Sequence, residues 1–263
     1  MKIAIIGAGN MGGAIARGLA RTAADTDVVV SNPSVGKLDA LKKEFPQIET
    51  TTDNCAAVAD AAYVFLAVKP WKMEEVIMEI KPFVDYEKQV IVSVAGGVGS
   101  NLLDGWLLKK GEMLPQLYIV IPNTAIATLC GMTFISGKRN AQSSDEYITS
   151  LFAAMGSAMM VPEELIPAGT SLASCGIAYA LQYINASMQG GRELGFSRSQ
   201  ALEIVMQTVR GALSVLEAGG KEPQAEIDRV TTPGGLTLRG LEAMREGGFS
   251  KSIIDGLHAS IKN

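Results

Sequence analysis

The chain has 263 residues, of which 48% are hydrophobic and 19% charged, with a formal net charge of -4. Length and composition indicate a globular protein, most simply of two domains, and the weak negative charge argues against nucleic acid or anionic lipid as partners. Three distant cysteines without a Cys-x-x-Cys pair argue against a zinc site and a disulfide framework. With neither a secretory signal nor a membrane span predicted, we expect a cytoplasmic protein that binds a small molecule, with no metal and no membrane partner.

Residues 1–161 alternate short β-branched runs with amphipathic stretches, as βαβ units with a mostly parallel, doubly wound sheet do. Apolar residues recur at three- and four-residue spacings in 35–45 and 71–80, and a proline follows each of these predicted helices. We therefore expect an α/β domain over 1–161. Its predicted strands span residues 2–6, 27–30, 48–50, 63–68, 89–94, 116–121, 132–136 and 158–161.

Beyond Pro162 the β-branched runs disappear, and the sequence is typical of successive helices. Ser197 and Ser250 are the expected N-caps of two of these helices. The change predicts a domain boundary between residues 161 and 162, followed by an all-α domain over 162–263. Its predicted helices span residues 169–194, 198–218, 224–230, 237–245 and 251–261.

A glycine motif directly follows the first predicted strand and leads into an apolar-periodic helix. Gly7 would allow a tight turn, Gly9 would let backbone amides approach a pyrophosphate, and Gly12 would let helix and strand pack closely. Because strand, motif and helix occur in the required order, the sequence predicts a Rossmann dinucleotide-binding domain rather than a glycine-rich turn without ligand. The expected cofactor contacts here are Gly7, Ala8, Gly9, Asn10, Met11 and Gly12.

The end of the second predicted strand distinguishes NAD from NADP, because an acidic residue there binds the ribose 2′-hydroxyl and repels a 2′-phosphate. No acid is present in Ser-Asn-Pro-Ser, residues 31–34, and Lys37 follows one turn later. These residues offer hydroxyl and amide donors and a cation to a phosphate. We therefore expect Ser31, Asn32 and Ser34 to bind NADPH, with NADH as the alternative; Ser34 could equally serve only as an N-cap.

Two further segments follow predicted strands at the sheet edge where open α/β sheets bind ligands. Ala-Val-Lys-Pro, residues 67–70, ends the fourth strand, and Asn123 follows Pro122 after the sixth. Lys69 is expected to contact the cofactor and is also a candidate catalytic residue. The alternative is that Lys69 is only a solvated loop lysine. The residues expected to flank the cofactor are Ala67, Val68, Lys69, Pro70 and Asn123.

The available proton donors limit the chemistry. The only histidine, His258, lies in the last predicted helix and is expected to be a surface or packing residue. No lysine occurs between Lys138 and Lys221, so the lysine that β-hydroxyacid dehydrogenases commonly use for the alcohol proton is missing. Reduction of a cyclic imine is less demanding, because a protonated C=N already accepts hydride. The hydroxyls and amides of residues 230–237 could bind the carboxylate of such a substrate at a helix N-terminus.

Residues 231–241, Thr-Thr-Pro-Gly-Gly-Leu-Thr-Leu-Arg-Gly-Leu, resemble the signature of pyrroline-5-carboxylate reductases. The glycine motif with Asn10-Met11, residues 67–70 and Pro122-Asn123-Thr124 occur in that family's order and spacing, so the resemblance covers nearly the whole chain. It implies NAD(P)H-dependent reduction of 1-pyrroline-5-carboxylate to L-proline by direct hydride transfer. It also implies a helical domain that forms an interwoven homodimer with the active site between subunits, and larger homo-oligomers built from dimers also occur.

The resemblance assigns further site residues by position. Asn54 would contact the adenosine side of the cofactor, and Ser93, Ala95 and Gly96 would lie near its nicotinamide half. Thr237 would hydrogen-bond the ring nitrogen and is the other candidate catalytic residue. The residues that would surround the cyclic imino acid are Thr232, Gly234, Gly235, Leu236 and Thr237, with Glu163 as a further neighbour.

Three departures from the family pattern leave alternatives open. Residues 173–177 read Ala-Ser-Cys-Gly-Ile where the family usually has Ser-Gly-Ser-Gly-Pro, Ile119 replaces a usual arginine, and Glu222 a common histidine. A reductase of a related imine and a non-catalytic NADP-binding regulatory protein are therefore the alternatives to a proline-forming enzyme.

Overall fold

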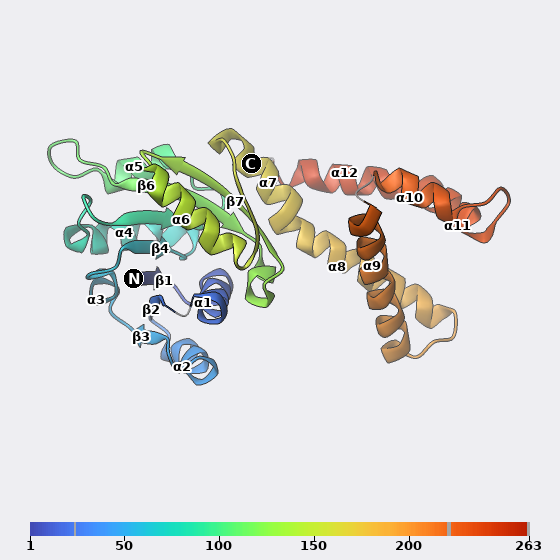
Figure 1. Ribbon diagram of the computed structural model, residues 1–263, viewed down its shortest axis with the longest axis horizontal. Coiled ribbons are helices and arrows are strands. Elements are labelled where there is room, and N and C mark those ends of the chain that lie inside the picture. The colour runs from blue at the N-terminus through green and yellow to red at the C-terminus, as the bar shows by residue number, and fades with distance from the viewer. Residues whose placement is uncertain (24, 220–221, 262–263) are drawn as a thin grey trace. The chain divides into compact units, whose positions relative to one another are not determined.

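The first compact unit of the chain is built around one sheet (Figure 1). The computed structural model describes residues 1–23, 25–219 and 222–261, which divide into the units Met1–Cys175 and Gly176–Asn263. The sheet has the strand order β3-β2-β1-β4-β5-β6-β7-β8, and every neighbouring pair is parallel except β6 and β7. The predicted doubly wound α/β domain is confirmed. Its strands are β1 (Lys2–Ile6), β2 (Asp27–Ser31), β3 (Glu49–Thr51), β4 (Tyr63–Leu66), β5 (Val90–Ser93), β6 (Gln116–Pro122), β7 (Gly131–Lys138) and β8 (Gly156–Met160).

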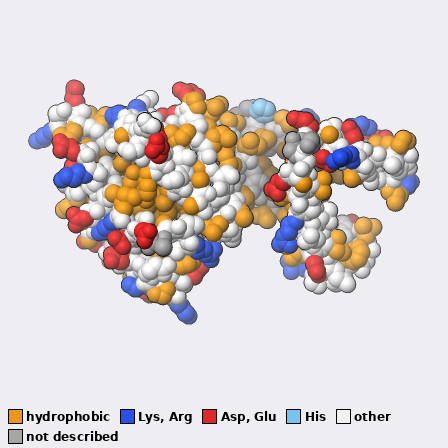
Figure 2. Space-filling view, in the orientation of Figure 1, with side chains coloured by type: hydrophobic (Ala, Val, Ile, Leu, Met, Phe, Trp, Pro, Cys, Tyr) orange, Lys and Arg blue, Asp and Glu red, His pale blue; other side chains and the backbone are white. Residues whose placement is uncertain are grey.

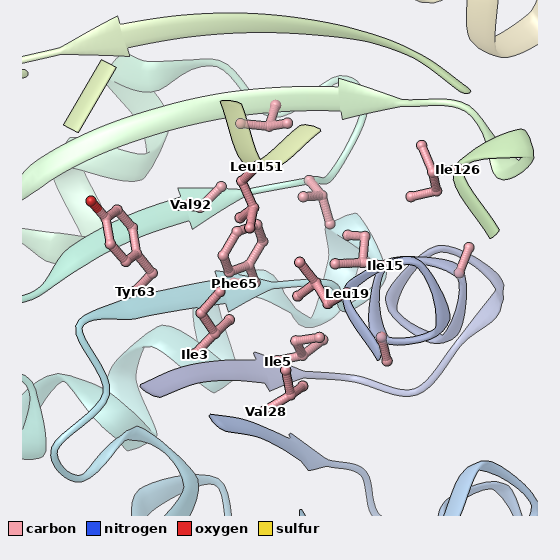
Figure 3. Packing of buried hydrophobic residues seen from close by; sticks show 14 of the residues in the cluster. Ile3, Ile5, Ile15, Leu19, Val28, Tyr63, Phe65, Val92, Ile126 and Leu151 are labelled. Atoms are coloured by element: carbon pink, nitrogen blue, oxygen red, sulfur yellow. The ribbon is translucent and has the colours of Figure 1, made fainter. Parts of the chain in front are cut away.

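Helices cover both faces of this sheet because successive strand residues point to opposite sides. Ile3 and Ile5 pack on one side with α1 (Asn10–Thr22), α2 (Val35–Glu44) and α6 (Gln142–Ala153). Figure 3 shows this cluster, in which the Phe65 ring lies 6.1 Å from that of Phe152. Ala4 and Ile6 pack on the other side. The helices there are α3 (Asn54–Val58), α4 (Met73–Ile80) and α5 (Ser100–Leu107).

Residues 162–175 also pack in the first unit. Ile166 is buried, and Gly169 of α7 (Ile166–Gly169) lies so close to Phe134 that an added Cβ would come within 2.7 Å of its ring. A π-helical segment, Thr170–Cys175, follows α7. The boundary expected between residues 161 and 162 therefore marks a change in the sequence pattern, and as a boundary between domains it stays a prediction.

The second unit consists of helices with almost no buried interior. Ala201 is the one residue of its described part that is buried, while Leu181 and Leu213 are 59% and 55% exposed. Figure 2 shows apolar side chains among the charged ones on the surface of these helices. The helices are α8 (Gly176–Glu193), α9 (Arg198–Gly219), α10 (Pro223–Val230), α11 (Leu236–Glu246) and α12 (Phe249–Ala259). None of the described helices combines the length and apolar character needed to cross a membrane.

One of the two predicted N-caps in this unit is confirmed and the other is wrong. Ser197 Oγ accepts a hydrogen bond from the Gln200 N–H at 3.3 Å, and Gln200 Oε1 accepts from the Ser197 N–H at 3.0 Å, which together form a capping box. Ser250 lies inside α12, which begins at Phe249. Gly248, with φ +77°, takes the N-cap position because glycine readily adopts this left-handed conformation.

Asp104 joins α5 to the end of β7. Its carboxylate accepts hydrogen bonds from Arg139 at 2.6 and 3.0 Å and lies 2.8 Å from Lys138 Nζ. Burial acts to raise the pKa of Asp104, but the hydrogen bonds and charges of Arg139 and Lys138 outweigh it, so the pKa lies below its usual value. A carboxylate whose pKa is lowered in the folded state stabilises the protein at pH values above its unfolded-state pKa. This contribution is lost as the pH falls through the folded-state pKa.

We expect Asp104→Asn to lower the free energy of unfolding by about 1–2 kcal/mol at neutral pH, because two cations lose their carboxylate partner. The loss should shrink at an acid pH, as the pH falls through the lowered folded-state pKa of Asp104 and the native carboxylate becomes protonated. Urea denaturation at both pH values measures the difference. Asp255→Asn, which removes an exposed pair with Lys251, is the control and should have little effect. An equal loss from Asp104→Asn at both pH values would contradict an electrostatic origin.

Candidate functional site

The carboxyl ends of β1, β2 and β4 lie side by side and bring three of the predicted site segments together. Ile6 is in register with both Ser31 and Leu66. Beyond these residues, the Gly7 N–H donates to Ser31 O at 2.7 Å, and the Ala67 N–H donates to Ile6 O at 2.8 Å. The glycine motif, the end of β2 and residues 67–70 therefore line one edge of the sheet, where open α/β sheets bind ligands.

The three motif glycines have different structural roles. Gly7 has φ +108°, and a Cβ there would lie 2.7 Å from Ala67 O; a Cβ on Gly12 would lie 1.9 Å from Gly7 O. Gly9, the N-cap of α1, would place a Cβ in open space, with no atom within 4 Å. No side chain caps α1 and no acidic residue occupies its first turn, so its N–H groups and positive dipole face that space. This cradle suits a pyrophosphate.

Asn32 ties the glycine motif to the loop after β2. Its Oδ1 accepts from the Ala8 N–H at 3.0 Å and its Nδ2 donates to Ser34 O at 3.2 Å. The side chain is buried and serves mainly to hold two loops in place. Ser34 is the N-cap residue of α2, but its side chain makes no capping hydrogen bond and is exposed, as is Lys37. Both therefore remain available to a phosphate.

The Ser31 hydroxyl points into the protein. Ser31 is fully buried, and its Oγ donates to Asn54 Oδ1 at 2.7 Å. Asn54 Nδ2 in turn donates to Glu79 Oε2 at 2.8 Å. A direct cofactor contact by Ser31 stays a prediction, and its observed role is to position Asn54. Sequence reasoning missed Glu79 because it lies near the end of α4, outside every motif.

Lys69 follows β4 and is exposed, as expected for a residue that could flank a cofactor. Its Nζ lies 5.9 Å from the centre of the Trp71 ring, and Trp71 is itself 76% exposed. The roles of Lys69 and its neighbours in residues 67–70 stay predictions.

The ends of β5 and β6 carry the remaining predicted cofactor residues. Ser93 is fully buried, and its Oγ has no hydrogen-bond partner among the described residues. It lies in register with Ile119, where the expected arginine is absent. Gly96 faces open space, whereas Ala95 is buried. These residues leave one orphaned hydroxyl at the nicotinamide side of the predicted site.

Asn123 is held within the fold. Its Oδ1 accepts from the Ala125 and Met132 N–H groups at 3.2 and 3.4 Å, and its Nδ2 donates to Ala173 O at 3.4 Å. The side chain therefore holds the loop after β6, and its cofactor contact stays a prediction.

Glu163 acts locally as a helix cap. Its Oε1 accepts from the Ser100 N–H at 2.7 Å, at the N-terminus of α5. It also lines an open groove of about 810 Å³ together with Ser136 and Lys138. Its predicted place beside the substrate stays a prediction.

In the second unit, residues 231–237 form an exposed turn into α11. The Gly235 N–H donates to Thr232 O at 2.9 Å, and Gly234 has φ +72°, which glycine allows. Gly235 is the N-cap of α11 and no side chain caps the helix. Leu236 is 80% exposed, and Thr232 and Thr237 are also exposed. Backbone N–H groups and hydroxyls are thus presented together, which is the arrangement that binds a carboxylate.

Comparisons with known proteins match both parts of the chain. Residues 2–97 match the family model "NADP oxidoreductase coenzyme F420-dependent", and residues 163–263 match "Pyrroline-5-carboxylate reductase dimerisation". Pyrroline-5-carboxylate reductase 2 of Dictyostelium discoideum is 31% identical over 97% of this chain and 89% of its own length. Reductase 1 of the same organism is 32% identical over 98% of this chain, which spans 48% of that longer protein. The 1-pyrroline-5-carboxylate reductase structure from Streptococcus pyogenes is 27% identical, with a TM-score of 0.88 over 99% of this chain and 96% of its own.

We expect Gly9→Ala to fold normally but to weaken NADPH binding at least about tenfold, because the added methyl group enters the space where backbone amides would approach the pyrophosphate. Gly105→Ala in α5 also adds a methyl group in open space and is the matched control. Fluorescence titration measures NADPH affinity, and thermal denaturation checks folding. Unchanged affinity in Gly9→Ala would contradict the assignment of this cradle.

Proposed function

Because the chain belongs to the pyrroline-5-carboxylate reductase family, we propose that it reduces 1-pyrroline-5-carboxylate to L-proline, with NADPH as hydride donor and NADH as the alternative. It is thus an oxidoreductase that acts on a C=N group, in the last step of proline biosynthesis. The observation that carries the proposal is that one chain combines the open cradle at Gly9 with the exposed turn of residues 231–237.

The residues at the sheet edge fit a dinucleotide. Gly7 and Gly12 have no room for side chains, whereas Gly9 opens the N-terminus of α1 toward the pyrophosphate. Ser34 and Lys37 are exposed where a 2′-phosphate would bind, and the end of β2 carries no acid. NADPH, when bound, supplies the hydride.

The turn into α11 would bind and orient the imine. The uncapped N–H groups at the start of α11 would hold the substrate carboxylate, assisted by the positive end of the helix dipole. The Thr237 hydroxyl would hydrogen-bond the ring nitrogen and so fix the position of the C=N bond. Because the protonated imine already carries positive charge, positioning contributes most of the catalysis and solvent water can supply the proton.

We further propose that the protein is a cytoplasmic homodimer, with rings of dimers as the larger form. Support for a homo-oligomer comes from the dimerisation model that matches residues 163–263. Apolar side chains such as Val215 and Ile254 are 52% and 53% exposed, and a second copy of the chain would cover them. The three cysteines are free, as in a reducing compartment.

Purified protein mixed with NADPH and 1-pyrroline-5-carboxylate should oxidise NADPH and form equimolar proline. Loss of absorbance at 340 nm measures NADPH oxidation, and amino-acid analysis measures proline formation. Absence of both NADPH oxidation and proline would reject this substrate, and NADPH oxidation with a different cyclic imine would then indicate a related imine as substrate. NADPH binding without turnover of any imine would contradict the enzyme assignment and favour a regulatory role.

We expect Thr237→Val to lower kcat/KM for the imine by about 10²-fold, because the isosteric change removes the hydroxyl that would hydrogen-bond the ring nitrogen. Thr237→Ser keeps the hydroxyl and should retain most of the activity. Thr208→Val is the control, since that exposed hydroxyl bonds only the Ile204 carbonyl of its own helix. Steady-state kinetics measure all three variants, and equal activity of the Val and Ser variants at residue 237 would contradict the proposed role.

A further inference from the structure

A carboxylate from α4 lies two hydrogen bonds away from the end of β2. Glu79 accepts from the Asn54 amide at 2.8 Å, and Asn54 accepts from the Ser31 hydroxyl at 2.7 Å. The direction of these bonds is fixed because an ionised carboxylate can only accept. The Asn54 amino group must therefore face Glu79, its oxygen must face β2, and the Ser31 proton is committed to Asn54.

The negative charge of Glu79 is little compensated by the surrounding protein. None of the ion pairs found among the described residues includes Glu79. This charge affects a neighbouring thiol, since the pKa of Cys55 is raised first by burial and then by the charges of Glu79 and Asp53. Asp53, the other nearby acid, accepts hydrogen bonds from the Cys55 and Ala56 N–H groups at the start of α3. Glu79 thus adds a negative charge beside the site that Asn54 shares with β2.

An acid at the end of β2 is what turns a dinucleotide site toward NAD, because it repels the 2′-phosphate of NADP. Here the end of β2 has no acid, but the fold brings one in from α4. We propose that Glu79 is a specificity-determining residue that lowers the preference of this chain for NADPH over NADH. The inference rests on the proposed function, in which the end of β2 binds the adenosine ribose. Ser34 and Lys37 favour the phosphate, and Glu79 opposes them, so that both cofactors are accepted.

The variant Glu79→Gln removes the charge but keeps an oxygen that can accept from Asn54. Fluorescence titration with NADPH and with NADH, in the absence of imine, gives the two Kd values without any need for turnover. We expect the Kd for NADPH to fall about twofold in dilute buffer. The effect is this small because solvent screens the repulsion between the 2′-phosphate and the Glu79 carboxylate. The Kd for NADH should stay unchanged. The gain should disappear at about 1 M salt, where the screening length is only about 3 Å.

The matched control is Glu87→Gln. Glu87 is exposed in the turn before β5, at the opposite end of the parallel strands, so the same loss of charge there should change neither Kd. Equal changes for both cofactors, or a gain that persists in high salt, would overturn the proposal because geometry rather than charge would then be responsible. Absence of binding to either nucleotide would overturn it together with the proposed function. Binding that shifts as expected without reduction of any imine would contradict the proposed function alone.

Discussion

The contact between the start of α1 and the end of β1 sets the position of everything at the dinucleotide edge. Gly7 turns the chain at φ +108°, and Gly12 then lies against the Gly7 carbonyl with no space for a side chain. The same approach seats Ile15 and Leu19 in the core beside Ile3 and Ile5 (Figure 3). A bulkier residue at position 12 would move the helix outward, and would weaken the core and misplace the Gly9 cradle together. Stability and cofactor binding therefore depend on one backbone contact.

Polar side chains around this contact mostly hold loops in position. Asn32 joins the glycine motif to the loop after β2, and Asn54 joins β2 to α3 and α4. Because their amide groups are already hydrogen-bonded, the loops are fixed before any ligand arrives, and less conformational entropy is lost on binding. Exposed groups such as Ser34 and Lys37 are left to contact the ligand. In the proposed site, specificity would arise from the balance between these exposed donors and the charge of Glu79.

The sequence predicted those features that depend on neighbouring residues. Each predicted strand is present, since alternating or continuous apolar residues indicate burial on a sheet. The glycine motif lies between the first strand and the first helix, as predicted. The errors concern partners that are distant in sequence or details of backbone conformation. Ser250 has the right residue type for an N-cap, but Gly248 caps α12 two residues earlier through its left-handed backbone. The Ser31 hydroxyl faces inward and bonds Asn54, and Glu79 bonds Asn54 from 25 residues further along the chain. Neither contact produces a local sequence pattern from which it could be predicted.

The helical unit raises a different physical requirement. Its helices expose residues such as Leu213 and Ile254, and only Ala201 is buried in the described part of the unit. So little burial cannot offset the entropy lost in ordering these helices. Packing against other apolar surfaces must supply the missing stability, which is what a dimerisation segment provides when two copies associate. The turn proposed to hold the imine begins α11 in this unit. In the proposed homodimer, the rigidity of this turn and the orientation of Thr237 would depend on the same association.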